Sequence, residues 1–314
     1  MKKLMTAAAL LTTLTAAAQW HPAGDRIKTS WGEGLDPANV LAEYPRPQMV
    51  RGEWQNLNGL WNYAIRPAGE VPVAWDGEIL VPFAAESSLS GVGRRVGAEQ
   101  ELWYERSFTI PAKWSGRRVL LHFGAVDWRA DVWVNGVSLG RHEGGYTPFD
   151  FDVTPALQKG VNTLRVRVWD PTDAGCQPRG KQVNNPEVIW YTPVTGIWQT
   201  VWLENLPEAY ISHTKYYPDI DRQKLVIEAQ TVGGEGLTLA ASASYAGKPM
   251  GHGEVTVHGG KAVLELPLNE LYLWEVGAGR LYDLTLTFGE DRVDSYFGMR
   301  RIECRDGILY LNGK

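Results

Sequence analysis

Short runs of strand-forming residues, each bounded by turn residues, constrain the fold of this chain more than any other feature. In residues 164–169 apolar and basic side chains alternate, so leucine and valine face one side of a strand and Arg165 and Arg167 face the other. Asn135-Gly136 separates two further runs, and both residues tolerate the positive φ angles of a tight hairpin turn. The 34 glycines and 18 prolines leave little room for long helices. The pattern predicts an all-β fold of antiparallel sheets, each with one buried and one wet face.

The composition changes near Leu206-Pro207, where a second set of short strands begins. Thirteen of the 14 tryptophans precede this point, and only Trp274 follows it. A length of 314 residues predicts about two domains. We therefore expect one β-sandwich over residues 19–206, including an N-terminal lead-in, and a second β-sandwich over residues 207–297. The second has the size and strand spacing of an immunoglobulin-like module.

Residues 1–18 have the features of a secretory signal peptide. Two lysines precede an apolar stretch at residues 7–17, and Ala16-Ala17-Ala18 supplies the small residues of a cleavage site. The stretch is too short to cross a bilayer as a helix of the mature protein. We expect cleavage before Gln19 and export to the periplasm or the medium, with no remaining membrane attachment. An uncleaved anchor is the alternative.

The charge and the composition exclude several classes of protein. A net charge of −5 provides no basic surface for nucleic acid, and 44% hydrophobic residues exclude wholesale disorder. The six histidines lack the spacing of a zinc site, so neither a metal nor another cofactor is expected. Cys176 and Cys304 are predicted to be separate thiols, with a bridge between them as the alternative. The sequence does not specify an oligomeric state.

Aromatic side chains among polar ones on loops are the strongest chemical signal in the sequence. Flat rings match the C–H faces of pyranoses, and nearby polar groups can hold sugar hydroxyls. Residues 179–182 and Trp190-Tyr191 have this mixture. Tryptophans within strands, such as Trp133 and Trp202, are predicted to lie in the core instead. Carboxylates are scattered, so no catalytic pair can be read from their spacing, and no catalytic residue is assigned.

Several motifs in order resemble glycoside hydrolase family 2, the family of β-galactosidases, β-glucuronidases and β-mannosidases. They lie at residues 121–127, 132–136, 142–149, 152–154, 195–203, 297–300 and 309–314. The resemblance extends from about Tyr44 to Lys314. It implies a jelly-roll-like sugar-binding domain over residues 19–206, an immunoglobulin-like domain over residues 207–297 and the start of a (β/α)₈ barrel over residues 298–314.

The resemblance also implies where the family's chemistry lies. The barrel has about 250 residues and carries two glutamates for retaining hydrolysis. Only 14 residues follow Arg300, and Asn269-Glu270 lies in the second domain, so it receives no catalytic role. The chain is therefore expected to be a non-catalytic N-terminal portion of an exported hydrolase, with the barrel as its intramolecular partner. The alternatives are a stand-alone carbohydrate-binding protein and an adhesive β-sandwich protein without a ligand.

Two loops match family loops that contact the terminal sugar of an oligosaccharide or glycoside. They contribute eight candidate substrate-binding residues, namely Glu86, Ser87, Arg179, Lys181, Gln182, Glu187, Trp190 and Tyr191. Some family members place an acidic residue ahead of the aromatic one in the second loop. This chain has Val188-Ile189 there, and the nearest acid is Glu187. The resemblance thus implies a β-glycoside without specifying the sugar.

Overall fold

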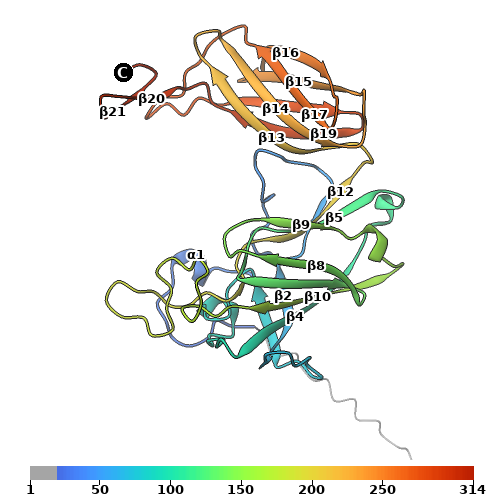
Figure 1. Cartoon of the computed structure of the whole chain (residues 1–314), viewed down its shortest axis with the longest axis vertical. Coiled ribbons are helices and arrows are strands. Elements are labelled where there is room, and N and C mark those ends of the chain that lie inside the picture. Colours follow the sequence, from blue (N-terminus) through green and yellow to red (C-terminus); the bar gives the residue numbers. More distant parts are fainter. Residues whose placement is uncertain (1–19) are drawn as a thin grey trace, which may run out of the picture.

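The computed structural model describes residues 20–314 and shows two β-rich domains arranged end to end (Figure 1). The all-β prediction is confirmed, since the α-helix in this range, α1 (Ser30–Glu33), has four residues. The predicted signal peptide lies outside the described residues, so export stays a prediction. Within residues 20–314 no helix is long and apolar enough to cross a membrane.

The first domain is built from twelve strands in antiparallel sheets. Six strands form one sheet in the order β3-β2-β4-β10-β7-β8, four form a second in the order β1-β12-β5-β9, and β6 pairs with β11. The strands are β1 (Trp54–Asn56), β2 (Gly59–Pro67), β3 (Gly77–Val81), β4 (Gln100–Thr109), β5 (Arg118–Phe123), β6 (Val126–Asp127), β7 (Arg129–Val134), β8 (Val137–Glu143), β9 (Phe149–Asp152), β10 (Val161–Trp169), β11 (Gly196–Ile197) and β12 (Val201–Leu206). Three short 3₁₀ turns, η1 (Ser88–Ser90), η2 (Ala112–Trp114) and η3 (Thr154–Ala156), lie between them.

Local sequence rules account for much of this domain. Along β10 buried and more exposed residues alternate, as the sequence predicts. Asn135 and Gly136 adopt φ angles of 52° and 80° and connect β7 to β8, which confirms the hairpin. Side chains from the inner faces of the sheets, including Trp61 and Phe123, form one continuous core. Burial of this apolar surface is the main force that holds the sheets together.

One prediction for the strand tryptophans is wrong. Trp202 is buried as expected, but Trp133 is only half-buried and lies on the outer face of the six-stranded sheet. There its ring stacks on Trp103, with 5.9 Å between the ring centroids, and the Arg167 guanidinium lies 5.7 Å from its ring. The alternation along β7 places Val132 and Val134 inside, which leaves Trp133 on the other face.

The second domain also contains two antiparallel sheets, as a β-sandwich requires. Three strands pair in the order β13-β14-β17, and four pair in the order β16-β15-β18-β19. The strands are β13 (Tyr210–Asp219), β14 (Lys224–Val232), β15 (Thr238–Tyr245), β16 (Lys248–Thr256), β17 (Lys261–Pro267), β18 (Tyr282–Phe288) and β19 (Asp291–Phe297). Their inner side chains, including Tyr282 and Phe288, form a second and separate core.

A two-stranded hairpin follows the second domain. β20 (Ile302–Arg305) and β21 (Ile308–Leu311) pair across an Asp306-Gly307 turn. The hairpin extends away from the rest of the chain (Figure 1), and Leu309 is exposed on it. The start of a barrel in this region stays a prediction. Cys304, on this hairpin, and Cys176, in the first domain, are both exposed and form no disulfide.

Candidate functional site

The two loops predicted to contact substrate lie next to each other in the structure. The first, residues 82–99, follows β3, and the second, residues 170–195, connects β10 to β11. The backbone N–H of Thr195 donates a hydrogen bond of 2.9 Å to Glu86 Oε2. The Arg95 guanidinium donates to the backbone carbonyl of Asn184. The topology therefore brings together residues that are about a hundred positions apart in the sequence.

The candidate residues of the first loop face inward. Glu86 is 3% exposed and lies beneath the loops instead of on their surface. The hydroxyl of Ser87 accepts a hydrogen bond of 3.2 Å from the backbone N–H of Leu89 and so caps η1. Both side chains thus have defined structural roles. Neither forms part of the outer surface of the loop pair.

The candidate residues of the second loop face outward. Trp190 is 41% exposed and Tyr191 is 61% exposed. The backbone around them is fixed, because the N–H of Tyr191 donates to the carbonyl of Lys181 at 2.9 Å and the N–H of Trp190 donates to that of Glu187 at 3.0 Å. Lys181 and Glu187 are themselves exposed. This loop therefore presents two aromatic rings to solvent from an ordered backbone.

The remaining candidates, Arg179 and Gln182, lie between these two groups. Both are half-buried, and Arg179 Nε and Gln182 Oε1 are buried polar atoms without a hydrogen-bond partner in the described part of the chain. Buried polar atoms in native proteins nearly always have a partner. A hydroxyl-rich ligand or bound water would supply the missing donors and acceptors.

A cluster of buried carboxyl groups, which we call the acid cluster, lies at the base of the two loops. It consists of Glu86, Asp127 at the end of β6, and Asp170 just after β10. Asp170 accepts hydrogen bonds from the backbone N–H of Thr172 at 2.9 Å and from the Thr195 hydroxyl at 3.3 Å. One oxygen of Glu86 has no partner within residues 20–314. Asp127 is 7% exposed, and no hydrogen bond from a described residue offsets its burial.

Burial makes these groups weak acids. Burial, together with the charges of Asp170 and Glu86, raises the pKa of Asp127 to about 8. Burial also raises the pKa of Glu86 to about 7, against the effect of its hydrogen bonds from Thr195. The pKa of Asp170 is raised for the same main reason, its burial. Asp127 therefore retains its proton near neutral pH and Glu86 does so in part, so these two groups can donate hydrogen bonds as well as accept them.

A tight turn links the acid cluster to the exposed loop. A Cβ atom at Gly145 would lie 2.5 Å from Asp127 Oδ1, so only glycine fits there. The Trp198 indole N–H holds the turn by donating 2.8 Å to the Gly145 carbonyl. The next residue, Tyr146, is exposed, and its hydroxyl would lie 3.5 Å from a Cβ atom at Gly180 in the second loop. Tyr146 thus lies between the acid cluster and the second loop.

Sequence reasoning missed two of the three members of the acid cluster. Asp127 and Asp170 are 43 positions apart, and no spacing rule relates them. Antiparallel pairing of β10 with β7, in which Trp169 lies opposite Arg129, brings them together. The sequence contains only an indirect signal for these two members of the acid cluster. Asp127 and Asp170 each stand at the end of a run of strand-forming residues.

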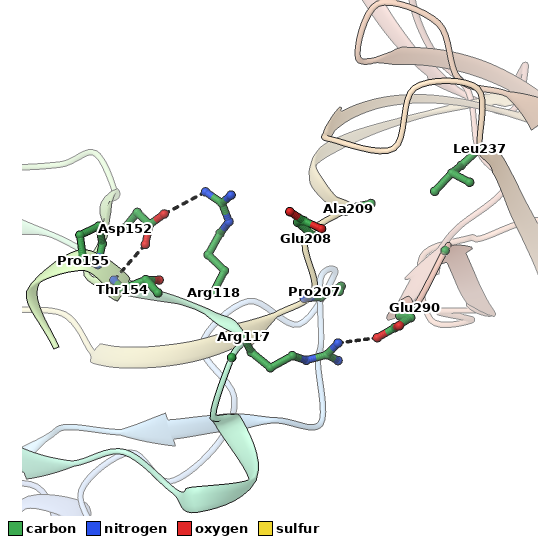
Figure 2. Close-up of a pocket in the computed structure, with 12 residues that line it drawn as sticks. Arg117, Arg118, Asp152, Thr154, Pro155, Pro207, Glu208, Ala209, Leu237 and Glu290 are labelled. Atoms are coloured by element: carbon green, nitrogen blue, oxygen red, sulfur yellow. Dashed lines mark hydrogen bonds and ion pairs between the residues drawn. The ribbon is translucent and has the colours of Figure 1, made fainter. Parts of the chain in front are cut away.

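A large groove lies elsewhere, at the junction of the two domains (Figure 2). It has a volume of about 790 Å³, and none of the eight candidate residues lines it. Figure 2 shows four of its charged side chains in pairs: Arg118 with Asp152 at 2.8 Å, and Arg117 with Glu290. Because both arginines of the groove already have carboxylate partners, the groove is a weaker candidate than the loop pair. Within the described range, no group of three or more His, Cys, Asp or Glu residues is arranged to hold a metal ion.

Comparisons with known proteins place these residues in a family. Residues 82–195, which include the acid cluster and both loops, match the family described as glycosyl hydrolase 2 galactose-binding domain-like. The β-glucuronidase of Felis catus is 28% identical over 95% of this chain and 52% of its own length. The β-galactosidase of Thermoanaerobacter pseudethanolicus is 26% identical over 68% of this chain and 30% of its own length. The chain thus spans about half, or less, of the length of these relatives.

Solved structures show the same relationship. The β-glucuronidase of Bifidobacterium dentium, complexed with coumarin-3-O-glucuronide, superposes with a TM-score of 0.66 at 25% identity and covers 85% of this chain and 51% of its own. The β-glucuronidase of Ruminococcus gnavus superposes with a TM-score of 0.67 at 21% identity. The resemblance carried by the sequence motifs is confirmed. Residues 82–195 match the family described as glycosyl hydrolase 2 galactose-binding domain-like, and the chain is similar to the N-terminal half of β-glucuronidases and a β-galactosidase.

Proposed function

We propose that this chain is the sugar-binding N-terminal portion of a family 2 glycoside hydrolase that acts on terminal β-glycosides. The observation that carries the proposal is the acid cluster, buried within the matched residues 82–195 and next to a loop that presents Trp190 and Tyr191. Carboxyl groups bind sugar hydroxyls, and aromatic rings pack against the C–H faces of pyranoses. The relatives named above are β-glucuronidases and a β-galactosidase, which supports a β-glycoside as ligand.

The charge of the acid cluster, taken by itself, favours a neutral sugar over a uronic acid. No lysine or arginine forms an ion pair with Glu86, Asp127 or Asp170 among residues 20–314. A carboxylate on the ligand would be repelled by these groups wherever they are ionised. The hydroxyl groups of a neutral pyranose would instead find hydrogen-bond donors as well as acceptors, because Asp127 and part of Glu86 are protonated near neutral pH.

We expect the chain by itself to hydrolyse no nitrophenyl β-galactoside, β-glucuronide or β-mannoside above the uncatalysed rate. Retaining hydrolysis requires two carboxyl groups on opposite sides of the scissile bond, about 5–5.5 Å apart. In our proposal those groups belong to the part of the relatives that this chain does not match. Turnover that persists through purification and disappears in Asp127→Asn would refute the non-catalytic role.

Removing the Trp190 indole tests the sugar-binding role directly. We expect Trp190→Ala to weaken binding of a neutral methyl β-glycoside by about fivefold, because a ring that packs on a sugar contributes about 1 kcal/mol. The measurement is ligand-observed NMR titration with methyl β-galactoside and methyl β-glucuronide. Trp75→Ala is the matched control, since its indole packs near Arg165 at the six-stranded sheet, away from the loop pair.

Two outcomes would contradict this role. One is unchanged affinity in Trp190→Ala, and the other is an equal loss in the Trp75→Ala control. Tighter binding of the glucuronide than of the galactoside would overturn the preference for a neutral sugar while leaving the site in place.

A further inference from the structure

The lead-in segment contains a short stretch, residues 44–51, that crosses between the two domains before β1 begins. We call this stretch the strap; it is part of the blue loop between the two domains in Figure 1. One end pairs with the second domain. The N–H of Val50 donates 2.9 Å to the carbonyl of Asp294, the N–H of Asp294 returns a bond of 2.9 Å, and the Gln48 amide donates 3.1 Å to the carbonyl of Tyr296. The strap thus occupies the outer edge of β19, the last strand of its sheet.

The other end of the strap is bound to the first domain through Glu204. This residue lies on β12 and its side chain is fully buried. The Arg46 guanidinium lies 2.5 Å from Glu204 Oε2, and the Tyr44 hydroxyl donates to Oε1. His122 Nε2, from the neighbouring strand β5, lies 3.0 Å from Oε2. The charge of Glu204 is therefore surrounded by donors from the strap and from its own domain.

Arg51, the last residue of the strap, joins the two domains. Its Nε and Nη2 atoms donate to the two oxygens of Asp291 on β19 at 2.8 and 2.7 Å. Nη2 also donates 2.7 Å to the carbonyl of Ile211, and Nη1 lies 3.4 Å from Glu204 Oε1. A planar guanidinium suits such a site, because its fixed fork can serve several acceptors at once. Arg51 is 5% exposed, so these interactions are shielded from water.

The other charged contact between the domains is much weaker. Arg117 pairs with Glu290 across the groove of Figure 2, and both side chains are open to solvent. Exposed pairs of this kind contribute little to stability. The linker itself is short, since β12 ends at Leu206 and β13 begins at Tyr210. A short linker limits separation of the domains but does not define an angle between them.

We propose that the strap sets the orientation of the second domain on the first, and that Arg51 is the residue that holds the two domains in this orientation. Its guanidinium neutralises a carboxylate from each domain in a buried site, so rotating either domain would leave a buried charge without its partner. The strap thereby fixes where the second domain and its hairpin lie relative to the loop pair. This inference is independent of the proposed sugar-binding role.

The two natural cysteines allow a direct test in the full chain. Cys176 lies in the first domain and Cys304 on the hairpin after the second, and both are exposed and unpaired, so spin labels can be attached without further substitution. Pulsed electron resonance then gives the distribution of distances between them. We expect a narrow distribution in the unmodified chain and a broad one in Arg51→Met, with a fall of roughly 10 °C in its unfolding midpoint. Arg117→Met is the matched control and should leave the distribution narrow.

The second variant is Asp291→Asn, which keeps an acceptor for the Ile211 N–H but removes the charge that Arg51 binds. It should broaden the distribution as well, and it decides the question if Arg51→Met does not fold. A distribution as narrow as that of the unmodified chain in a folded Arg51→Met or Asp291→Asn protein would overturn the proposal. Equal broadening in Arg117→Met would also overturn it, since the exposed pair would then hold the domains as firmly as the strap.

Discussion

Replacing Glu204 by glutamine is expected to lower the free energy of unfolding by about 3–5 kcal/mol at pH 7. The substitution keeps the shape of the side chain but removes the charge that faces Arg46 and Arg51. Removing one partner of a buried ion pair leaves the other charge buried without compensation, which costs more than the pair itself contributes. Urea unfolding monitored by tryptophan fluorescence measures the difference.

The control for this substitution is Glu105→Gln. Glu105 pairs with Arg165 at 2.6 Å on the outer face of the six-stranded sheet, where water screens the charges. We expect it to cost less than 1 kcal/mol. A loss in Glu204→Gln that is no larger than this would contradict the importance assigned to the buried charges.

The pH dependence of Glu204 has a definite sign. Burial by itself would raise the pKa of this carboxyl group, but the His122 imidazole 3.0 Å away and the charges of Arg46 and Arg51 outweigh burial and hold the pKa well below its usual range. A carboxyl group of this kind stabilises the fold above its unfolded pKa, near 4.3, and the contribution is lost as the pH falls through the folded value. The stabilities of the unmodified chain and Glu204→Gln should therefore begin to converge as the pH falls below about 4, and meet only below the folded pKa.

Local sequence patterns predict those parts of the structure that depend on neighbouring residues. The alternation along β10 and the turn at Asn135-Gly136 appear where the sequence places them, because side-chain alternation and positive φ angles are local properties. The domain boundary near Leu206-Pro207 stays a prediction, and in the structure β12 ends at Leu206 and β13 begins at Tyr210. The family resemblance, and no local pattern, predicted that the two loops lie close together. A resemblance to a family of known fold carries information on tertiary structure that local patterns lack.

Contacts between distant residues could not be predicted in this way. Arg51 and Asp291 are 240 positions apart, and the sequence alone assigned the whole lead-in to the first domain. The structure instead pairs the strap with β19. Asp127 and Asp170 were missed for the same reason, because strand pairing determines their proximity. Burial then raises the pKa values of these carboxyl groups, and no sequence pattern predicts that a single carboxylate is buried.

Asp127→Asn is expected to stabilise the chain in alkaline solution, which is the opposite of the usual effect of changing a buried residue. Burial and the charges of Asp170 and Glu86 raise the pKa of Asp127 to about 8. A carboxyl group with a raised folded pKa stabilises the fold fully below its unfolded value, near 3.9, and loses that contribution as the pH rises through the folded value. Asparagine carries no charge at any pH. The free energy of unfolding of the variant should therefore exceed that of the unmodified chain by roughly 5 kcal/mol at pH 9.

Urea unfolding at intervals between pH 4 and pH 9 measures this difference in the free energy of unfolding. The control is Asp131→Asn, for which we expect a loss of stability instead of a gain. Partial burial alone would raise the pKa of Asp131, but hydrogen bonds from Arg141 and Arg167 lower it, so this variant should lose stability above pH 4. A difference in stability between Asp127→Asn and the unmodified chain that does not grow with pH would contradict the burial of an unpartnered carboxyl group.

If Asp127→Asn gains stability and also loses affinity for a neutral glycoside, the residue is retained at a cost to the fold because it binds ligand. A gain in stability with unchanged affinity would instead remove Asp127 from the sugar site.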